Sequence, residues 1–197
     1  MFVSAASVAG RLALVMELAR QVSLGAKNAK VVAARAGEGA RGFQPITDFI
    51  NELAAGTIDL ARAINDGALA LSRAAVEETR ARGARDRFAQ VRERAASAAH
   101  AASLEAPLAE SRRQVQALRQ RFQEHYKRLG ALLDEIDRSM RAGKVIATSA
   151  RVEASVGAEF RGNLEKIASD LEQAAQTIQE QIRGCRSILA RSDSDSP

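Results

Sequence analysis

The chain has 197 residues, a net charge of +5, and 46% hydrophobic against 27% charged residues. This balance excludes wholesale disorder, and 41 alanines with 4% aromatic residues argue against a bulky globular core. The three prolines stand at positions 45, 107 and 197 and leave two long stretches without a helix breaker. The composition therefore predicts an all-α protein of long, closely packed helices.

Four helices are predicted from the periodicity of the apolar residues. Apolar and small side chains recur at alternating steps of three and four, the pattern of a helix in a bundle. The predicted helices span about 4–36, 43–101, 104–157 and 163–191. Glycine-rich or proline-containing segments separate them and predict chain reversals. Residues 192–197 are expected to form a disordered tail.

The order of these helices predicts an elongated antiparallel coiled coil or four-helix bundle. It would consist of two helical hairpins, residues 1–102 and 103–191. Because the outer helices are the shorter ones, residues near 80–130 are expected to project as a two-helix coiled coil. The third and fourth helices would carry Val152 and Cys185 on their apolar faces.

The register of the middle reversal is predicted by pairing apolar residues across it. Pairing Phe88 with Phe122, and Ala95 with Val115, centres the reversal on residue 105. The two outer reversals are not equidistant from that centre, so we expect a bend or an unwound turn near Gly83 to absorb the difference.

The interior of the bundle has no predicted catalytic role. Leu60 and Ile64 are expected to face the core, and Cys185 to act as a small buried hydrophobic residue. His100 and His125 lack catalytic or zinc-ligand partners at a suitable spacing, and no phosphate-binding loop follows a strand. We therefore expect no enzyme, no cofactor and no metal site.

The charge is concentrated in residues 73–128, which hold 13 basic and 7 acidic residues. Such a segment is typical of a solvated helical face, and it also allows binding to nucleic acid or to an acidic scaffold partner. No run approaches the length of a membrane span, and Arg11 interrupts the N-terminal apolar stretch, which is unlike a signal peptide. These features predict a cytoplasmic protein without a membrane span.

The run QVSLGAKNAKVVAARAGEGARGF, residues 21–43, resembles the hairpin tip of methyl-accepting chemotaxis receptors, in particular through AARAGE followed by RGF. The resemblance covers about 35 residues. In that family the tip docks a coupling protein and a histidine kinase, and it contacts other receptors. The resemblance implies the same partners here, bound through residues 24–43, with the contact residues Leu24, Asn28, Val31, Arg35, Glu38, Arg41 and Phe43.

These tip residues also have structural interpretations. Leu24, Val31 and Phe43 are expected to be core residues more often than docking residues. The charges of Arg35, Glu38 and Arg41 suit a salt-bridged turn as well as a docking surface. Residues that family dimers use to form trimers are replaced here, and we therefore expect binding without trimers. The replacements are Arg20, Lys27, Val32 and Pro45.

An internal echo of the tip occurs at residues 149–162, which overlay the first tip with one insertion or deletion. This second, degenerate tip would contribute Arg151, Glu153, Glu159 and Arg161. Receptors of the family are dimers of one hairpin, so a chain with two hairpins would be an intramolecular pseudodimer, with a homodimer as the alternative. The closest match to the family's methylation sites is Glu77 and Glu78, and modification there is not favoured.

Overall fold

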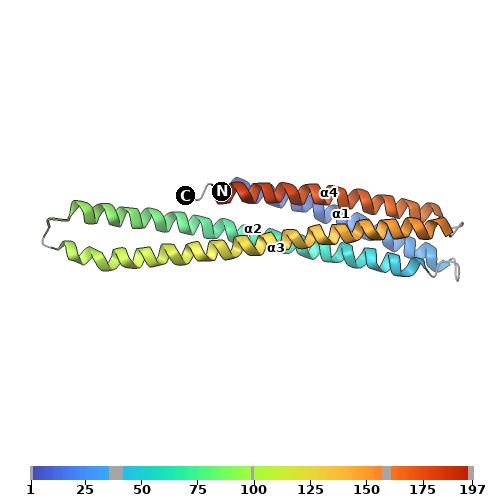
Figure 1. The fold of residues 1–197 in the computed structure, drawn as a ribbon, viewed down its shortest axis with the longest axis horizontal. Helices are drawn as coiled ribbons and strands as arrows, with labels where there is room; N and C mark the ends of the chain where they lie inside the picture. The colour runs from blue at the N-terminus through green and yellow to red at the C-terminus, as the bar shows by residue number, and fades with distance from the viewer. Residues whose placement is uncertain (1, 36–41, 99, 157–160, 195–197) are drawn as a thin grey trace.

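Four long α-helices make up most of the chain (Figure 1). They are α1 (Phe2–Arg35), α2 (Phe43–Arg94), α3 (Glu105–Val156) and α4 (Arg161–Ser194), with a short 3-10 helix, η2 (Ala101–Leu104), before α3. The computed structural model describes residues 2–35, 42–98, 100–156 and 161–194. These residues contain no strand, which confirms the all-α prediction. The predicted helix limits agree with the structure within three residues, except at the end of α2.

The helices form an up-and-down bundle in which neighbours in sequence are neighbours in space. Contacts join α1 to α2, α2 to α3, α3 to α4, and α4 back to α1. The end of α1, the start of α2, the end of α3 and the start of α4 lie at the same end of the rod, here called the tip end (Figure 1).

The rod has two thicknesses because the helices differ in length. α1 and α4 have 34 residues each, whereas α2 and α3 have 52. The first and last helices consequently end halfway along the rod, and α2 and α3 continue alone (Figure 1). Residues 80–117 form this extension, here called the projecting hairpin, which confirms the predicted two-helix projection.

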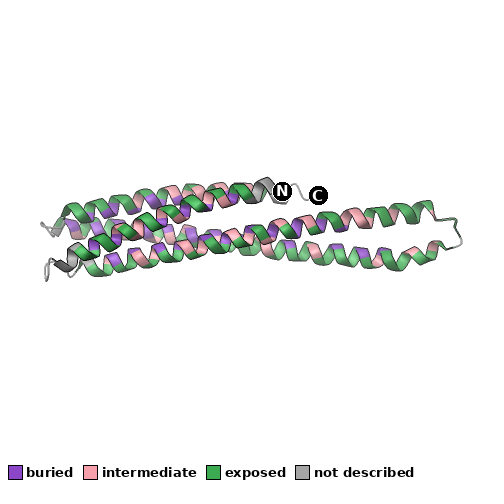
Figure 2. Cartoon of the chain, turned by 180° about the vertical axis from the view of Figure 1, so that it is seen from behind, coloured by how far each residue is buried: buried purple, intermediate pink, exposed green. Residues whose placement is uncertain are grey.

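The core follows the apolar seam of each helix (Figure 2). One cluster fills the middle of the rod, and a second, richer in alanine, lies toward the tip end. Ile64 is fully buried as predicted, whereas Leu60 is only partly buried and packs against the edge of the core. The largest fully buried apolar side chains are Leu12, Ile50, Ile64, Leu108, Leu129, Leu133, Ile136, Leu164 and Ile182.

Many buried positions of the first hairpin have a buried counterpart in the second hairpin, 121 residues later. Ile50 and Leu171 are one such pair. The same offset relates buried residues in α1 to those in α3, and buried residues in α2 to those in α4. Buried pairs at this offset include Val8 and Leu129, Leu12 and Leu133, Val15 and Ile136, Ala61 and Ile182, and Ala68 and Leu189. The echo seen in the tips thus extends through both hairpins.

The register of α2 against α3 differs from the prediction. A Cβ on Gly143 would lie 2.9 Å from Leu53 Cδ2, and Arg92 forms an ion pair with Glu105 at 3.1 Å. In an antiparallel helix pair, the numbers of two facing residues add to twice the number at the centre of the reversal. The two contacts give sums of 196 and 197, whereas a reversal centred on residue 105 would give 210. The reversal is therefore centred near residue 98, and the Phe88–Phe122 and Ala95–Val115 pairings are wrong.

Three further expectations about the helices are wrong. The helix does not extend to residue 101, because α2 ends at Arg94 and the turn occupies the residues that follow. With the reversal placed there, no compensating break is required, and α2 runs unbroken through Gly83. At the C-terminus, α4 continues to Ser194, so residues 192–194 are helical and not part of a disordered tail.

An arginine bridges α1 and α4 near the middle of the rod. Arg11 donates a hydrogen bond to Gln181 Oε1 at 2.9 Å, and its guanidinium lies over Gly184. A Cβ at Gly184 would be 2.5 Å from Arg11 Cζ, so the glycine provides the space for this contact. The adjacent Cys185 is fully buried, as predicted.

The thiol of Cys185 is expected to be unreactive in the native protein. Burial raises the pKa of Cys185 from 9.0 to about 11, although the charge of Arg11 acts in the opposite direction. A thiol reagent at about pH 8 should leave the native protein unmodified and react rapidly in denaturant. Because the pKa is higher in the folded state, this thiol's contribution to stability is fully present below pH 9 and is lost as the pH rises toward 11. Rapid labelling without denaturant would contradict the buried placement.

Candidate docking tips

The first tip carries two exposed apolar side chains on α1. Leu24 is 60% exposed and Val31 is 53% exposed, one heptad apart. Their interpretation as core residues is therefore wrong. Neighbouring positions of the helix, including Ala26 and Ala29, are buried instead. Small residues at the core positions of α1 allow close helix packing and leave the larger apolar side chains facing outward.

Polar contacts tie α1 to the start of α2 just below the first tip. Lys30 pairs with Asp48, and the Ser23 hydroxyl donates to Asn51 Oδ1 at 3.1 Å. The predicted contact residue Asn28 is exposed on α1. Arg35 and Phe43 end α1 and begin α2, and their side chains lie outside the described residues, as do Glu38 and Arg41 entirely.

The second tip is held by arginines that contact neighbouring backbone and carboxylates. Arg161, the first residue of α4, donates to the carbonyl oxygens of Ala154 and Ser155 at 3.4 Å each and thereby satisfies the C-terminal end of α3. Arg151 pairs with Glu172 across the α3–α4 hairpin.

Another second-tip residue contacts the first hairpin. Glu153 is half-buried, and its carboxylate lies where a Cβ on Gly42 would be, which joins the start of α2 to the end of α3. Glu159, the remaining predicted residue of this tip, lies outside the described residues.

Two functional candidates were missed by the sequence reasoning. Val145 and Val152 on α3 are 65% and 62% exposed, and they stand 121 residues after Leu24 and Val31. Val152 is thus not on the apolar seam, contrary to the prediction. We call Leu24 with Val31 the first ridge, and Val145 with Val152 the second ridge. Val152 lies within the internal repeat found in the sequence, and extending that repeat upstream of residue 149 would have added Val145.

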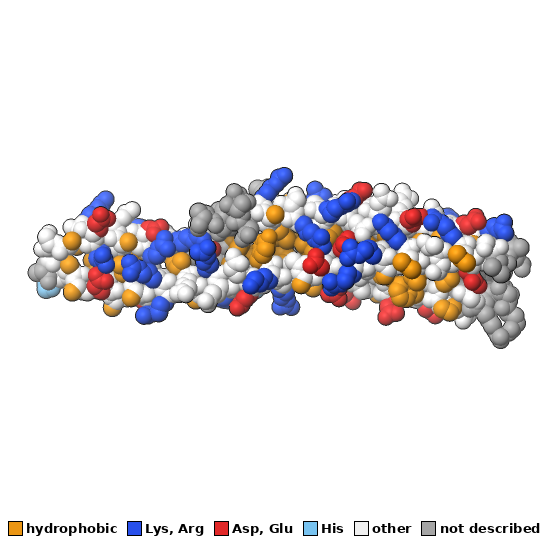
Figure 3. All heavy atoms as spheres, viewed as in Figure 1, with side chains coloured by type: hydrophobic (Ala, Val, Ile, Leu, Met, Phe, Trp, Pro, Cys, Tyr) orange, Lys and Arg blue, Asp and Glu red, His pale blue; other side chains and the backbone are white. Residues whose placement is uncertain are grey.

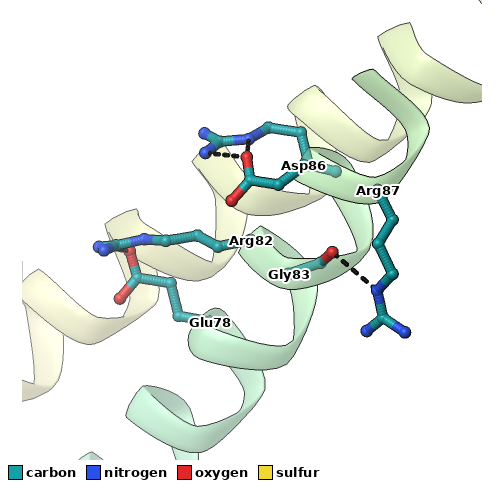
Figure 4. Close-up of polar contacts among 6 residues, drawn as sticks. Glu78, Arg82, Gly83, Asp86 and Arg87 are labelled. Carbon is teal, nitrogen blue, oxygen red and sulfur yellow. Dashed lines mark hydrogen bonds and ion pairs between the residues drawn. The ribbon is translucent and has the colours of Figure 1, made fainter. Parts of the chain in front are cut away.

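The candidate methylation residues have different environments. Glu78 is 3% exposed and accepts a hydrogen bond from Arg82 at 2.7 Å (Figure 4). Its carboxylate is therefore closed to a modifying enzyme, whereas Glu77 is exposed. The pair lies where α1 and α4 end and the projecting hairpin begins.

The projecting hairpin displays many basic side chains (Figure 3). Some of them are paired locally: Arg85 with Asp86, Arg92 with Glu105, and Arg113 with Glu110. These exposed pairs are typical of a solvated helical face, where each contributes at most about 1 kcal/mol to stability.

Among the described residues, none of the helices carries a stretch long and apolar enough to cross a membrane. Within the same residues, no group of three or more His, Cys, Asp or Glu side chains could hold a metal ion.

Comparison with known proteins does not assign the chain to a family or a function. No model of a protein family matches the sequence, and a search of curated proteins finds no match either. The placement of the two tips and ridges is accordingly the basis for a functional proposal.

Proposed function

We propose that this protein is a non-enzymatic signal-transduction adaptor, similar to the cytoplasmic hairpin of chemotaxis receptors. Its tip end would dock a chemotaxis coupling protein, a histidine kinase, or another receptor. The resemblance of residues 21–43 to the receptor tip provides the identity of these partners.

The observation that carries the proposal is the pair of exposed apolar ridges near the tip end. An exposed leucine or valine is individually unremarkable, but the same two positions are exposed in both hairpins. Apolar side chains that stay outside the core at equivalent positions are suited to packing into a partner groove. Because α1 and α3 lie diagonally in the bundle, the two ridges face different directions and suit two bound partners.

Charged groups near each ridge would set the orientation of a partner. Lys30 and Arg151 stand at equivalent positions, each beside the valine of its ridge and each paired with a carboxylate of the following helix. Apolar contact would provide most of the affinity, and these partly exposed ion pairs would favour one docking register.

The proposal is tested by binding a purified coupling protein and a histidine kinase to the full chain. Calorimetry or light scattering should detect association at tens of micromolar. Replacing Val31 and Val152 together by glutamate should weaken binding by about tenfold or more, because a carboxylate would be placed in the apolar contact. Each single variant should retain one functional ridge and lose about half of the binding capacity.

A matched control uses Leu69→Glu. Leu69 is 46% exposed on α2, far from the tip end, so this substitution adds the same charge as each single valine variant without touching a ridge. Equal loss of binding with Leu69→Glu would refute the ridge assignment. Growth of the free chain to assemblies of three receptor-like units would refute the expected absence of trimers.

The alternative function is a helical scaffold or nucleic-acid-binding protein that acts through residues 73–128. It would replace our proposal if no array component associates while duplex DNA binds with a steep dependence on salt concentration.

A further inference from the structure

The outermost line of α2 carries charges at a strict seven-residue spacing. Seven exposed residues form this line, here called the charged stripe, and its sign changes once along the helix. In chain order they are Glu52, Asp59, Asp66, Arg73, Arg80, Arg87 and Arg94. One heptad corresponds to about 10.5 Å along a helix, so the stripe extends from near the tip end into the projecting hairpin.

Most of the stripe has no ion-pair partner within the described residues. Asp59 pairs with Arg62, and Arg87 donates to the carbonyl oxygen of Gly83 (Figure 4). The carboxylates and guanidinium groups of the other five have no ion pair among these residues. Ion pairs among the described residues therefore do not explain the stripe.

The equivalent line of α4 lacks this polarity. The positions 121 residues after Glu52, Asp59 and Asp66 are Gln173, Glu180 and Ser187. The change of sign is thus a property of α2 and does not follow from the repeated hairpin. The position on α4 equivalent to Asp59 is also exposed and offers a matched control site.

The stripe is complementary to itself when two copies of α2 lie antiparallel. If the two-fold axis passes beside Ala70, Glu52 faces Arg87 of the second copy, Asp59 faces Arg80, and Asp66 faces Arg73. Symmetry generates each of these pairs twice, so six attractive pairs form and none is repulsive. A parallel arrangement would instead place like charges opposite each other along the whole stripe.

An apolar line runs beside the stripe at the same spacing. Phe49 and Val91 are 38% and 50% exposed, and small residues stand between them at Gly56, Ala63, Ala70 and Ala84. One position of this line is charged: Glu77 is exposed and would face Ala63 of the second copy. The two-fold axis beside Ala70 brings Phe49 against Val91 and Gly56 against Ala84. Small residues permit close approach of the two helices, and the two larger side chains would be covered at the ends of the contact.

We propose that the outer face of α2 binds a second copy of this chain in an antiparallel homodimer. Each projecting hairpin then lies beside the four-helix part of the other copy, and the two tip ends point in opposite directions. This inference is independent of the docking function, because neither ridge contributes to the contact.

A polyanion is the competing occupant of the four arginines. A nucleic acid following the arginine half toward the tip end would meet Asp66, Asp59 and Glu52 on the same line. A second copy satisfies the acidic half as well as the basic half, and the observations therefore favour the homodimer.

Charge reversal tests the proposal with the full chain. At about 0.05 M salt, where exposed charges are weakly screened, sedimentation should show a dimer that dissociates as salt is added. Asp59→Arg and Arg80→Glu should each weaken dimerisation by about tenfold or more, because each reversal creates two repulsive pairs. The double variant Asp59→Arg with Arg80→Glu restores complementarity and should recover dimerisation.

Glu180→Arg on α4 is the matched control and should leave dimerisation unchanged. A monomer at all concentrations up to tens of micromolar would overturn the proposal, as would failure of the double variant to recover. If Arg80→Glu abolished binding of duplex DNA by an otherwise monomeric chain, the arginines would be assigned to nucleic acid instead.

Cysteine cross-linking tests the orientation. Ala70→Cys should form an intermolecular disulfide under mild oxidation, because the residue lies beside the two-fold axis. Val91→Cys alone should not cross-link, whereas a mixture of Val91→Cys and Phe49→Cys chains should. Cross-linking of Val91→Cys to itself would indicate a parallel dimer and contradict the proposal. The native Cys185 does not interfere, since it is fully buried.

Discussion

Replacing Ile64 by alanine is expected to destabilise the protein by about 3 to 5 kcal/mol. Ile64 is fully buried in the central cluster, where the lost methyl and methylene groups cannot be replaced by solvent. The cost combines the lost transfer free energy with that of the cavity left behind. Urea unfolding followed by circular dichroism measures the change as a lower midpoint at an unchanged slope.

Leu60→Ala on the same helix is the matched control. Leu60 is only partly buried at the edge of the core, so its truncation should cost about 1 to 2 kcal/mol. An equal or larger loss for Leu60 would mean that the core seam of α2 is rotated relative to the structure.

Replacing Arg82 by alanine is expected to cost about 2 to 4 kcal/mol, because it leaves the buried carboxylate of Glu78 without its charged partner. The Glu78→Leu with Arg82→Leu double variant should lose much less, since no charge then remains in the apolar contact. Thermal or urea unfolding of the single and double variants at neutral pH measures this difference.

Arg85→Ala is the control for this second experiment. Arg85 pairs with Asp86 one turn further along the helix, where the carboxylate is exposed to water. Its removal should cost at most about 1 kcal/mol. A double variant at positions 78 and 82 that is as unstable as Arg82→Ala would show that the buried charge is not the cause.

The helices themselves could be predicted from the sequence because their signals are local. Heptad spacing of apolar residues defined where α1, α3 and α4 lie, and glycine or proline marked the reversals at the tip end. The end of α2 had no such mark. The alanine-rich residues 95–102 have high helix propensity, yet the chain must reverse there for α3 to pack against α2.

The error in register has a specific physical cause. The predicted and observed pairings differ by 14 in the sum of residue numbers, which is two heptads. A shift by whole heptads keeps apolar residues opposite apolar residues, so the seam alone cannot select one register. Side-chain contacts such as Leu53 over Gly143 distinguish the registers, because a large side chain on one helix requires a small residue opposite it on the other helix.

The exposure of the ridges could not be predicted for a related reason. Leu24 and Val31 are apolar and one heptad apart, and spacing does not say which of two adjacent stripes faces the core. In α1 the core stripe is occupied by Ala26 and Ala29, whose small size is compatible with close helix packing. Only the positions of the neighbouring helices decide between the stripes.

The repeated hairpins also differ in the volume of several core side chains, although Ile64 with Cys185 is a related pair in which the first hairpin has the larger residue. At four related positions the first hairpin has the smaller residue and the second the larger one: Ala19 and Met140, Thr57 and Ile178, Ala61 and Ile182, and Ala68 and Leu189. Two of these pairs, Ala19 with Met140 and Thr57 with Ile178, line the same small internal space.

Two first hairpins packed together would leave voids in these layers, and two second hairpins would be overfilled. Each hairpin therefore has its best complement in the other one. Separate hairpin fragments mixed in solution should consequently pair one first hairpin with one second hairpin. If two chains exchanged hairpins by domain swapping, each bundle would again contain one hairpin of each kind.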